Sequence, residues 1–306
     1  MIAKIILGTR GSELARAQAL LVEKAIRSAH PKVTIETKII ATRGDNAKVV
    51  DVQTGRKGLF TAEIERALLA GEVNVAVHSA KDLPSQTSSR AQIVAVLPRA
   101  SIDDVLILKH SGGLAALPSG ATVATGSVRR QRQLRWKRED LKVVDLRGNV
   151  PTRLRKLTEN VWDGIVLARA GLERLGFSAI QTEIGFQGGK FFLEILPSEI
   201  FLPAGGQGII ALQIRAADQN TSALLAAVND RETLLCLQAE REFLTQLHGD
   251  CNSPVGVHAT IRNGTMKLCA QVFEDESPMP RQAEVEGTPG EGDLLAAELL
   301  RKIGQD

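Results

Sequence analysis

Short apolar segments recur along this chain, each followed by a small residue and then by polar or basic residues, and they limit its fold more than any other feature. Residues 4–8, 34–41, 75–79 and 93–97 have the apolar or alternating pattern typical of strands. Helical patterns lie between them. After Pro98-Arg99-Ala100-Ser101, strand patterns resume at residues 105–108, 122–125, 143–146 and 164–168. Strands that alternate with helices predict parallel, doubly wound α/β sheets.

The carboxyl-terminal part follows a different pattern. A long helical pattern extends from Ala217 to Leu247, and residues 255–273 alternate like a hairpin around Asn263-Gly264, a favoured two-residue turn. An amphipathic helix is predicted over Asp293–Ile303. We therefore expect a small α+β unit after the two α/β units. The glycine-rich residues 176–194 are expected to form an irregular insertion.

The segment Val75–Pro84 ends in a cluster of functional side chains. After the apolar residues it presents His78, Ser79, Lys81 and Asp82, and Pro84 then ends the strand. Open α/β folds bind their ligands at the carboxyl ends of strands. This position makes the cluster a candidate site, with a solvated strand end as the alternative.

Arginines follow several of the other strand ends. Gly8-Thr9-Arg10 precedes Ser12, a good helix N-cap, and Gly126-Ser127 opens a helix that contains Arg129 and Arg130. Helix N-termini and guanidinium groups both favour carboxylates or phosphates. A basic helix face exposed to solvent is the alternative, but such a face more often mixes lysine with glutamate.

Three functional classes are compatible with these patterns. They are an enzyme that acts on a polyanion with Asp82 as its acidic centre, a two-lobed anion-binding protein, and a nucleic-acid-binding protein that uses residues 129–156. The net charge is only +3 and aromatic residues make up 3%, with no tyrosine, so nucleic acid is the weakest of the three. A carboxylate among arginines favours the enzyme.

Targeting and metal-binding signals are not apparent. The amino terminus does not resemble a signal peptide, and no apolar run reaches the ~20 residues of a membrane helix, so we expect a cytoplasmic protein without membrane contact. The cysteines are Cys236, Cys251 and Cys269, an odd number without C-x-x-C spacing. His248, Asp250, Cys251 and His258 fit no standard zinc pattern, and we expect no metal.

The chain resembles the porphobilinogen deaminase (hydroxymethylbilane synthase) family. The matching motifs occur in the family's order along nearly the whole sequence. They are Gly8-Thr9-Arg10 with Ser12, Leu14 and Ala15; Lys57-Gly58-Leu59-Phe60; Val77–Pro84; Gly126-Ser127-Val128-Arg129-Arg130; Leu146-Arg147-Gly148-Asn149 with Thr152-Arg153-Leu154; Ala170–Leu175; Pro203-Ala204 with Gly206-Gln207-Gly208; and Cys251 with Pro254.

The resemblance implies three domains and a covalent cofactor. Two doubly wound lobes would resemble type II periplasmic binding proteins, with residues 1–100 and 201–217 in domain 1, residues 101–200 in domain 2, and residues 218–306 in a small α+β domain 3. Family members carry a dipyrromethane cofactor on one cysteine, which corresponds to Cys251; Cys236 and Cys269 match no functional position. Four porphobilinogen molecules are added head to tail with loss of ammonia, and the expected protein is a monomer.

The resemblance also assigns roles to individual residues. Asp82 would be the catalytic carboxylate, hydrogen-bonded to pyrrole N–H groups and stabilising the azafulvenium cation. The expected cofactor-binding residues are Lys81, Asp82, Thr125, Gly126, Ser127, Arg129, Arg130 and Cys251. The expected substrate-binding residues are Arg10, Ser12, Gln18, Lys57, Phe60, Arg147, Asn149, Arg153, Arg174 and Gln207. His78 has no assigned chemistry and is expected to be structural.

Overall fold

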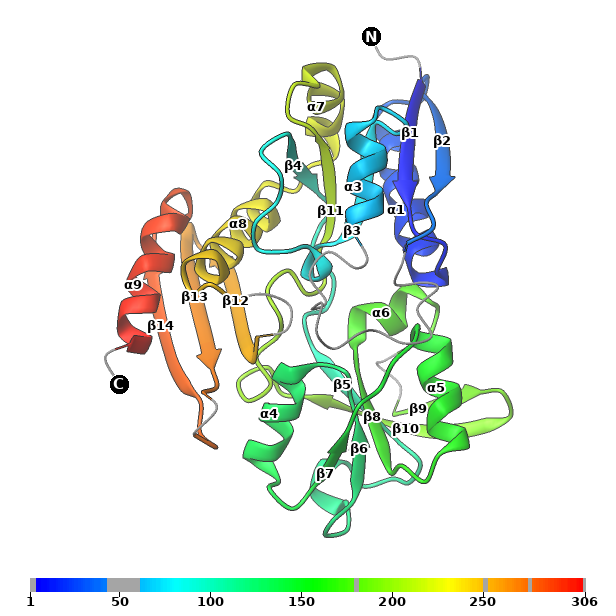
Figure 1. The fold of residues 1–306 in the computed structure, drawn as a ribbon, viewed down its shortest axis with the longest axis vertical. Helices are drawn as coiled ribbons and strands as arrows, with labels where there is room; N and C mark the ends of the chain where they lie inside the picture. The colour runs from blue at the N-terminus through cyan, green and yellow to red at the C-terminus, as the bar shows by residue number, and fades with distance from the viewer. Residues whose placement is uncertain (1–3, 43–60, 179–181, 250–252, 275–276, 305–306) are drawn as a thin grey trace.

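The computed structural model describes residues 4–42, 61–178, 182–249, 253–274 and 277–304. These residues form two α/β lobes and a smaller C-terminal unit, each built around its own sheet (Figure 1). The described strands number five in the first sheet, six in the second and three in the third. The prediction of two α/β lobes and a small α+β unit is confirmed.

The first lobe contains a sheet with the strand order β2-β1-β3-β11-β4. Val75 and Val77 of β3 pack in the core on the side of α1 and α7, whereas Ala76 packs toward α3 on the other face. This arrangement follows from the two-residue period of a strand. The elements are β1 (Lys4–Thr9), α1 (Glu13–Ala29), β2 (Thr34–Ile39), α3 (Ala62–Leu69), β3 (Val75–Ser79), β4 (Ala91–Val96), β11 (Ile210–Arg215) and α7 (Gln219–Leu225).

The second lobe contains a sheet with the order β7-β6-β8-β5-β10-β9. Leu134 of α4 packs on one face, and Leu154 of α5 with Leu172 of α6 packs on the other. The elements are β5 (Asp104–Leu108), β6 (Thr122–Ala124), α4 (Val128–Lys137), β7 (Lys142–Val144), α5 (Val150–Glu159), β8 (Gly164–Ala168), α6 (Arg169–Arg174), β9 (Glu183–Phe186) and β10 (Gly189–Leu196).

Both large sheets are mixed rather than parallel throughout, which corrects the sequence prediction. β11 runs antiparallel to β3, with Ile210 beside Ser79, and β5 runs antiparallel to β8, with Asp104 beside Ala168. The chain passes from the first lobe into β5 and from the second lobe into β11. Each of these strands begins at the edge of its sheet where the parallel strands end. It must therefore run in the opposite direction.

Residues 176–194 are not an irregular insertion. β9 and β10 form a hairpin at the edge of the second sheet, closed by Gln187 and Gly188, both with positive φ. A positive φ is unusual for glutamine, so the turn gave no clear sequence signal. The single helix expected over 217–247 is also divided, because residues 226–230 separate α7 from α8 (Arg231–Gln246).

The C-terminal unit packs α8 and α9 against one three-stranded antiparallel sheet. Its predicted hairpin is confirmed, with Asn263 and Gly264 in the turn between Arg262 and Thr265. Its other elements are β12 (Val255–Arg262), β13 (Thr265–Val272), β14 (Arg281–Gly287) and α9 (Gly292–Gly304). Within the described ranges, no helix is long and apolar enough to cross a bilayer.

Two segments connect the lobes and lie against each other. Leu97 donates its N–H to Ile210 O at 3.2 Å, and Ala100 donates to Gly208 O at 3.1 Å. Gly208 has a φ of +85°, and a Cβ there would lie 2.4 Å from Ala100 O. Only glycine allows this approach. The connections thus hold the carboxyl end of β3 near the start of β5.

Candidate active site

Asp82 lies just beyond the carboxyl end of β3, on the single 3-10 turn Ala80–Asp82. Leu83 closes this turn by donating its N–H to Ala80 O at 3.2 Å. The side chain of Asp82 is exposed, whereas residues 75–78 of β3 are buried. The turn therefore presents a solvent-accessible carboxylate at the end of a buried strand, as the sequence predicted.

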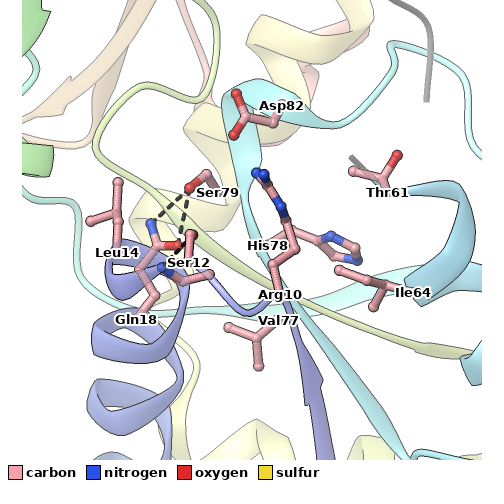
Figure 2. Close-up of a pocket in the computed structure, with 11 residues that line it drawn as sticks. Arg10, Ser12, Leu14, Gln18, Thr61, Ile64, Val77, His78, Ser79 and Asp82 are labelled. Atoms are coloured by element: carbon pink, nitrogen blue, oxygen red, sulfur yellow. Dashed lines mark hydrogen bonds between the residues drawn. The ribbon is translucent and has the colours of Figure 1, made fainter. Parts of the chain in front are cut away.

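A small pocket lies beside Asp82 (Figure 2). Asp82 is the carboxylate among its described lining residues, and the Arg10 guanidinium extends toward the same space (Figure 2). The pocket thus combines one anionic and one cationic side chain. It is lined by Arg10, Ser12, Leu14, Ala15, Gln18, Thr61, Ile64, Val77, His78, Ser79 and Asp82.

Two predicted substrate-binding residues make hydrogen bonds within the pocket wall. Ser12 is the N-cap of α1, where its hydroxyl accepts the N–H of Ala15 at 3.3 Å. Gln18 is buried and exchanges hydrogen bonds with the Ser79 hydroxyl at 2.7 and 3.1 Å. The Gln18–Ser79 bonds fix α1 against the end of β3, and the Ser12 cap begins the helix beside it, so both residues shape the pocket in this structure.

His78 is a buried, neutral residue. Its Nε2 lies 3.1 Å from Gln213 Oε1 on the neighbouring strand β11. Burial lowers the pKa of His78 to about 4, although the Gln213 hydrogen bond acts in the opposite direction. The imidazole is therefore uncharged at neutral pH, in accord with the structural role expected from the sequence.

Asp104, Arg129, Arg130 and Gln207 form a buried cluster between the lobes, which we call the Asp104 cluster. Arg129 Nη2 lies 2.9 Å from Asp104 Oδ2, and Arg130 Nη2 donates to Asp104 Oδ1 at 2.6 Å. Gln207 Nε2 also donates to Oδ1, at 2.8 Å. Burial by itself would raise the pKa of Asp104, but the two guanidinium groups hold it well below its usual range.

Lys81 borders the Asp104 cluster. Its Nζ donates to Gln207 Oε1 at 3.4 Å, and the side chain is half-buried. Burial, and next the charge of Arg130, lower the pKa of Lys81 to about 8. Lys81, Arg129 and Arg130 thus bring three cationic groups to the single buried carboxylate of Asp104. The excess of positive charge favours an anionic ligand here.

The predicted residues around the start of α4 hold the helix terminus in place. The Ser127 hydroxyl caps α4 by accepting the N–H of Arg130 at 3.5 Å, and Thr125 Oγ1 accepts the N–H of Ser127 at 3.3 Å. A Cβ on Gly126 would lie 2.5 Å from Leu146 O, so this position requires glycine. The turn therefore directs the amino end of α4 toward the lobe interface.

Four other predicted residues follow strands of the second lobe. Asn149 caps α5 by accepting the N–H of Thr152 at 2.9 Å, and Arg153 Nε donates to Gly148 O at 2.7 Å. Arg147 is exposed and pairs with Asp145 at 2.6 Å. Arg174 is half-buried and donates to Gly208 O at 2.6 Å, and burial lowers its pKa to about 10.

Lys57, Phe60 and Cys251 lie outside the described residues, so the predictions for them remain untested.

The sequence analysis did not identify two functional candidates, Asp104 and Glu240. Asp104 directly precedes the apolar run of residues 105–108, and a carboxylate at the start of a buried strand is a signal that could have been recognised. Glu240 lies on a helix without any distinguishing motif.

The fold and the site define a two-lobed α/β protein with a cluster of cationic side chains beside the lobe connections and an exposed carboxylate at a strand end. Residues 5–223 match the family model "Porphobilinogen deaminase, dipyromethane cofactor binding domain", and residues 234–304 match "Porphobilinogen deaminase, C-terminal domain". The chain belongs to the porphobilinogen deaminase family.

Full-length relatives agree with this assignment. The chain is 41% identical over 305 residues to porphobilinogen deaminase of Roseiflexus sp. (strain RS-1), covering 98% of this chain and 97% of that protein. It is 40% identical over 302 residues to the enzyme of Syntrophomonas wolfei, covering 98% of this chain and 94% of that protein.

Among solved structures, the methionine binding protein MetQ is similar with 13% identity and a TM-score of 0.45, covering 76% of this chain and 92% of that one.

The family defines the reaction and the cofactor. Porphobilinogen deaminases condense four porphobilinogen molecules into the linear tetrapyrrole hydroxymethylbilane, with release of ammonia, and use dipyrromethane as the primer. Each pyrrole bears an acetate and a propionate. A cationic site is thus what such a ligand requires.

Proposed function

We propose that Asp82 is the catalytic carboxylate of this enzyme. Positive charge develops on the substrate as ammonia leaves, and a carboxylate fixed beside that charge stabilises the transition state, commonly by a few kcal/mol. The observation that carries the proposal is the exposed Asp82 at the end of β3, the carboxylate among the described lining residues of its pocket. Because His78 is neutral, it adds no positive charge beside Asp82.

The Asp104 cluster and Lys81 are proposed to hold the carboxylates of dipyrromethane, which supplies a nucleophilic pyrrole carbon when bound. The Nε atoms of Arg129 and Arg130 are buried without a hydrogen-bond acceptor among the described residues, so both guanidinium groups retain donor capacity. Thr125, Gly126 and Ser127 place the amino end of α4 beside them. These donors fit a ligand with several carboxylates.

The remaining predicted residues are proposed to bind substrate carboxylates and the growing chain. Bidentate guanidinium–carboxylate contacts would orient each ring and thereby convert binding into positioning. The described candidates contribute from both lobes, which supports a ligand held between them. The full set is Arg10, Ser12, Gln18, Lys57, Phe60, Arg147, Asn149, Arg153, Arg174 and Gln207.

Cys251 is proposed as the attachment residue. The two other cysteines are poor candidates, because burial raises the pKa of Cys236 to about 12 and that of Cys269 to about 11. Neither thiol would ionise appreciably at neutral pH, and a thiolate is the reactive form. The chemistry of the described cysteines thus supports the assignment that the family motif gives.

We also propose the domain borders, the oligomeric state and the cellular location of the protein. The proposed domains are residues 1–100 with 201–217, residues 101–200 and residues 218–306. The packing of Leu224 and Leu225 in the first core favours a border between domains 1 and 3 that follows α7. The gap between the two family-model matches, residues 224–233, supports this border. A monomer that works in the cytoplasm remains the proposal for assembly and localisation.

Intact-mass measurement with peptide mapping tests the site assignment. Purified active enzyme is expected to carry one adduct with the mass of two linked pyrroles, mapped to Cys251. Cys251→Ser should lack the adduct and the activity, whereas Cys236→Ser and Cys269→Ser should keep both. An adduct on either of those two cysteines, or active enzyme of unmodified mass, would overturn the assignment.

A further inference from the structure

Arg241 of α8 binds the backbone that directly follows the candidate catalytic turn. Its Nη2 donates to Pro84 O and to Ser85 O, both at 2.9 Å. One helical turn later, the Thr245 hydroxyl approaches Ser85 O at 3.4 Å. Residues 84 and 85 belong to no strand or helix, and proline has no N–H to donate. The contacts from α8 therefore fix where the chain leaves Asp82.

Arg241 makes this structural contact with a charged side chain that is partly buried. Burial lowers the pKa of Arg241, and in the described part of the chain no carboxylate forms an ion pair with it. A partly buried charge held only by carbonyl dipoles is costly. Its charge also disfavours protonation of His78, whose pKa it helps to lower. Arg241 thus acts on both the position and the charge state of the residues around Asp82.

The neighbouring residue on α8 contacts the lobe connections. Glu240 accepts the N–H of Gly206 at 2.6 Å and pairs with Arg99. Glu240 therefore attaches α8 to the two lobe connections, and Arg241 attaches the same helix to the backbone after the Asp82 turn. α8 ends at Gln246, a few residues before the proposed attachment residue Cys251.

We propose that Arg241 is a positioning residue, which holds the Pro84-Ser85 backbone so that Asp82 keeps a fixed place relative to the C-terminal unit. The inference rests on the proposed role of Asp82. Arg241 touches no reacting group and acts through the turn. Loosening that turn should displace the carboxylate from the charge that it stabilises, and small displacements of this kind reduce rates by about 10–100-fold.

The test compares Arg241→Gln with Arg215→Gln in the holoenzyme. Arg215 is the control, because its Nη1 also donates to two carbonyls, Leu68 O and Val73 O, at the end of the β3 sheet away from Asp82. It differs from Arg241 in that its Nη2 also pairs with Asp218 at 2.8 Å. Both variants should lose thermal stability. Arg241→Gln should lower kcat by about 10–100-fold with little change in KM, whereas Arg215→Gln should keep the wild-type kcat.

A double variant separates the two proposals. In the Asp82→Asn background, Arg241→Gln should cause little further loss of kcat, because the group that it positions is already gone. Wild-type kcat in Arg241→Gln, with low kcat in Asp82→Asn, would overturn the positioning role and leave Asp82 catalytic. Near-normal kcat in Asp82→Asn would overturn the role of Asp82 itself. If Arg241→Gln does not fold, Arg241→Met, which keeps an apolar stem and removes the N–H donors, replaces it, and full kcat in that variant would reject the inference.

Discussion

Arg99 and Glu240 form a buried ion pair that joins the connection between the lobes to the C-terminal unit. Arg99 Nη1 donates to Glu240 Oε1 at 2.5 Å, and the Glu240 side chain is fully buried. The carboxylate also accepts the N–H groups of Gly206 and Ala259. Burial alone would raise the pKa of Glu240, but Arg99 and His258 outweigh it and bring the pKa to about 2.

Glu240→Gln is expected to reduce the free energy of unfolding by about 3–5 kcal/mol at pH 7, because it leaves Arg99 buried without its counter-charge. A carboxyl with a lowered folded-state pKa stabilises above its unfolded pKa and loses that contribution as the pH falls through the folded value. The difference between wild type and variant should therefore shrink between about pH 4.5 and pH 2. Urea unfolding across this range measures it.

A suitable control is Glu36→Gln, which removes the partner of Lys4 in an exposed pair. Exposed ion pairs contribute little, so this variant should unfold nearly as the wild type does. If Glu240→Gln were no less stable than Glu36→Gln, the buried pair would not be a major source of stability.

Asp104→Asn should reduce the unfolding free energy by about 3–5 kcal/mol, since Arg129 and Arg130 then lack their shared carboxylate. The loss should be full at neutral pH and should shrink as the pH falls below the ordinary Asp value of 3.8, because the folded-state pKa of Asp104 is lowered. Urea unfolding gives the stability, and intact mass gives the fraction of protein with bound cofactor. We expect that fraction to fall, and an unchanged fraction would argue against cofactor binding by the Asp104 cluster.

Lys81→Met should make the cofactor-free protein more stable at pH 7, because it removes a charge that is disfavoured first by burial and then by the nearby Arg130 and Arg129. The folded-state pKa of Lys81 is about 8 and its ordinary value is 10.5, so the unfolded chain binds this proton more tightly between those values. Wild-type stability should thus gain from this group as the pH rises through that window, and the advantage of the variant should shrink. Thermal unfolding at pH 7 to 10 measures the difference.

The same variant should hold the dipyrromethane cofactor less well, because it lacks one of the cationic groups proposed to bind the cofactor carboxylates. Intact mass should therefore show a smaller cofactor-bearing fraction for Lys81→Met than for the wild type. A variant that is less stable at pH 7 and carries the full cofactor fraction would contradict both the repulsion and the binding role.

Asp82→Asn should leave the fold and the covalent cofactor intact while lowering turnover by about 100-fold or more. Asn keeps the size of the side chain and removes its charge, so the change reports on electrostatic stabilisation. Steady-state kinetics, together with intact mass and circular dichroism of the same preparation, provide the measurement. Turnover close to wild type in a correctly folded, cofactor-bearing variant would exclude the proposed role.

Local sequence signals specified the helix starts and the candidate carboxylate. Ser12 caps α1 as predicted and Ser127 begins α4 as predicted, and each side-chain bond reaches only three residues along the chain. The Asn263-Gly264 turn and the placement of Asp82 at a strand end are equally local. Such features depend on backbone conformation over a few residues, and the sequence alone was enough to predict them.

Only the tertiary structure decided the direction of β11 and β5, the β9–β10 hairpin and the two buried ion clusters. Asp104 meets Arg130 across 26 residues, and Arg99 meets Glu240 across 141. No pattern within a strand or helix encodes such a pair, because each forms only when separate elements have packed. The elements are β5 and α4 for Asp104 and Arg130, and the lobe connection and α8 for Arg99 and Glu240. The same reason applies to Arg241, whose contact with the Asp82 turn spans 157 residues.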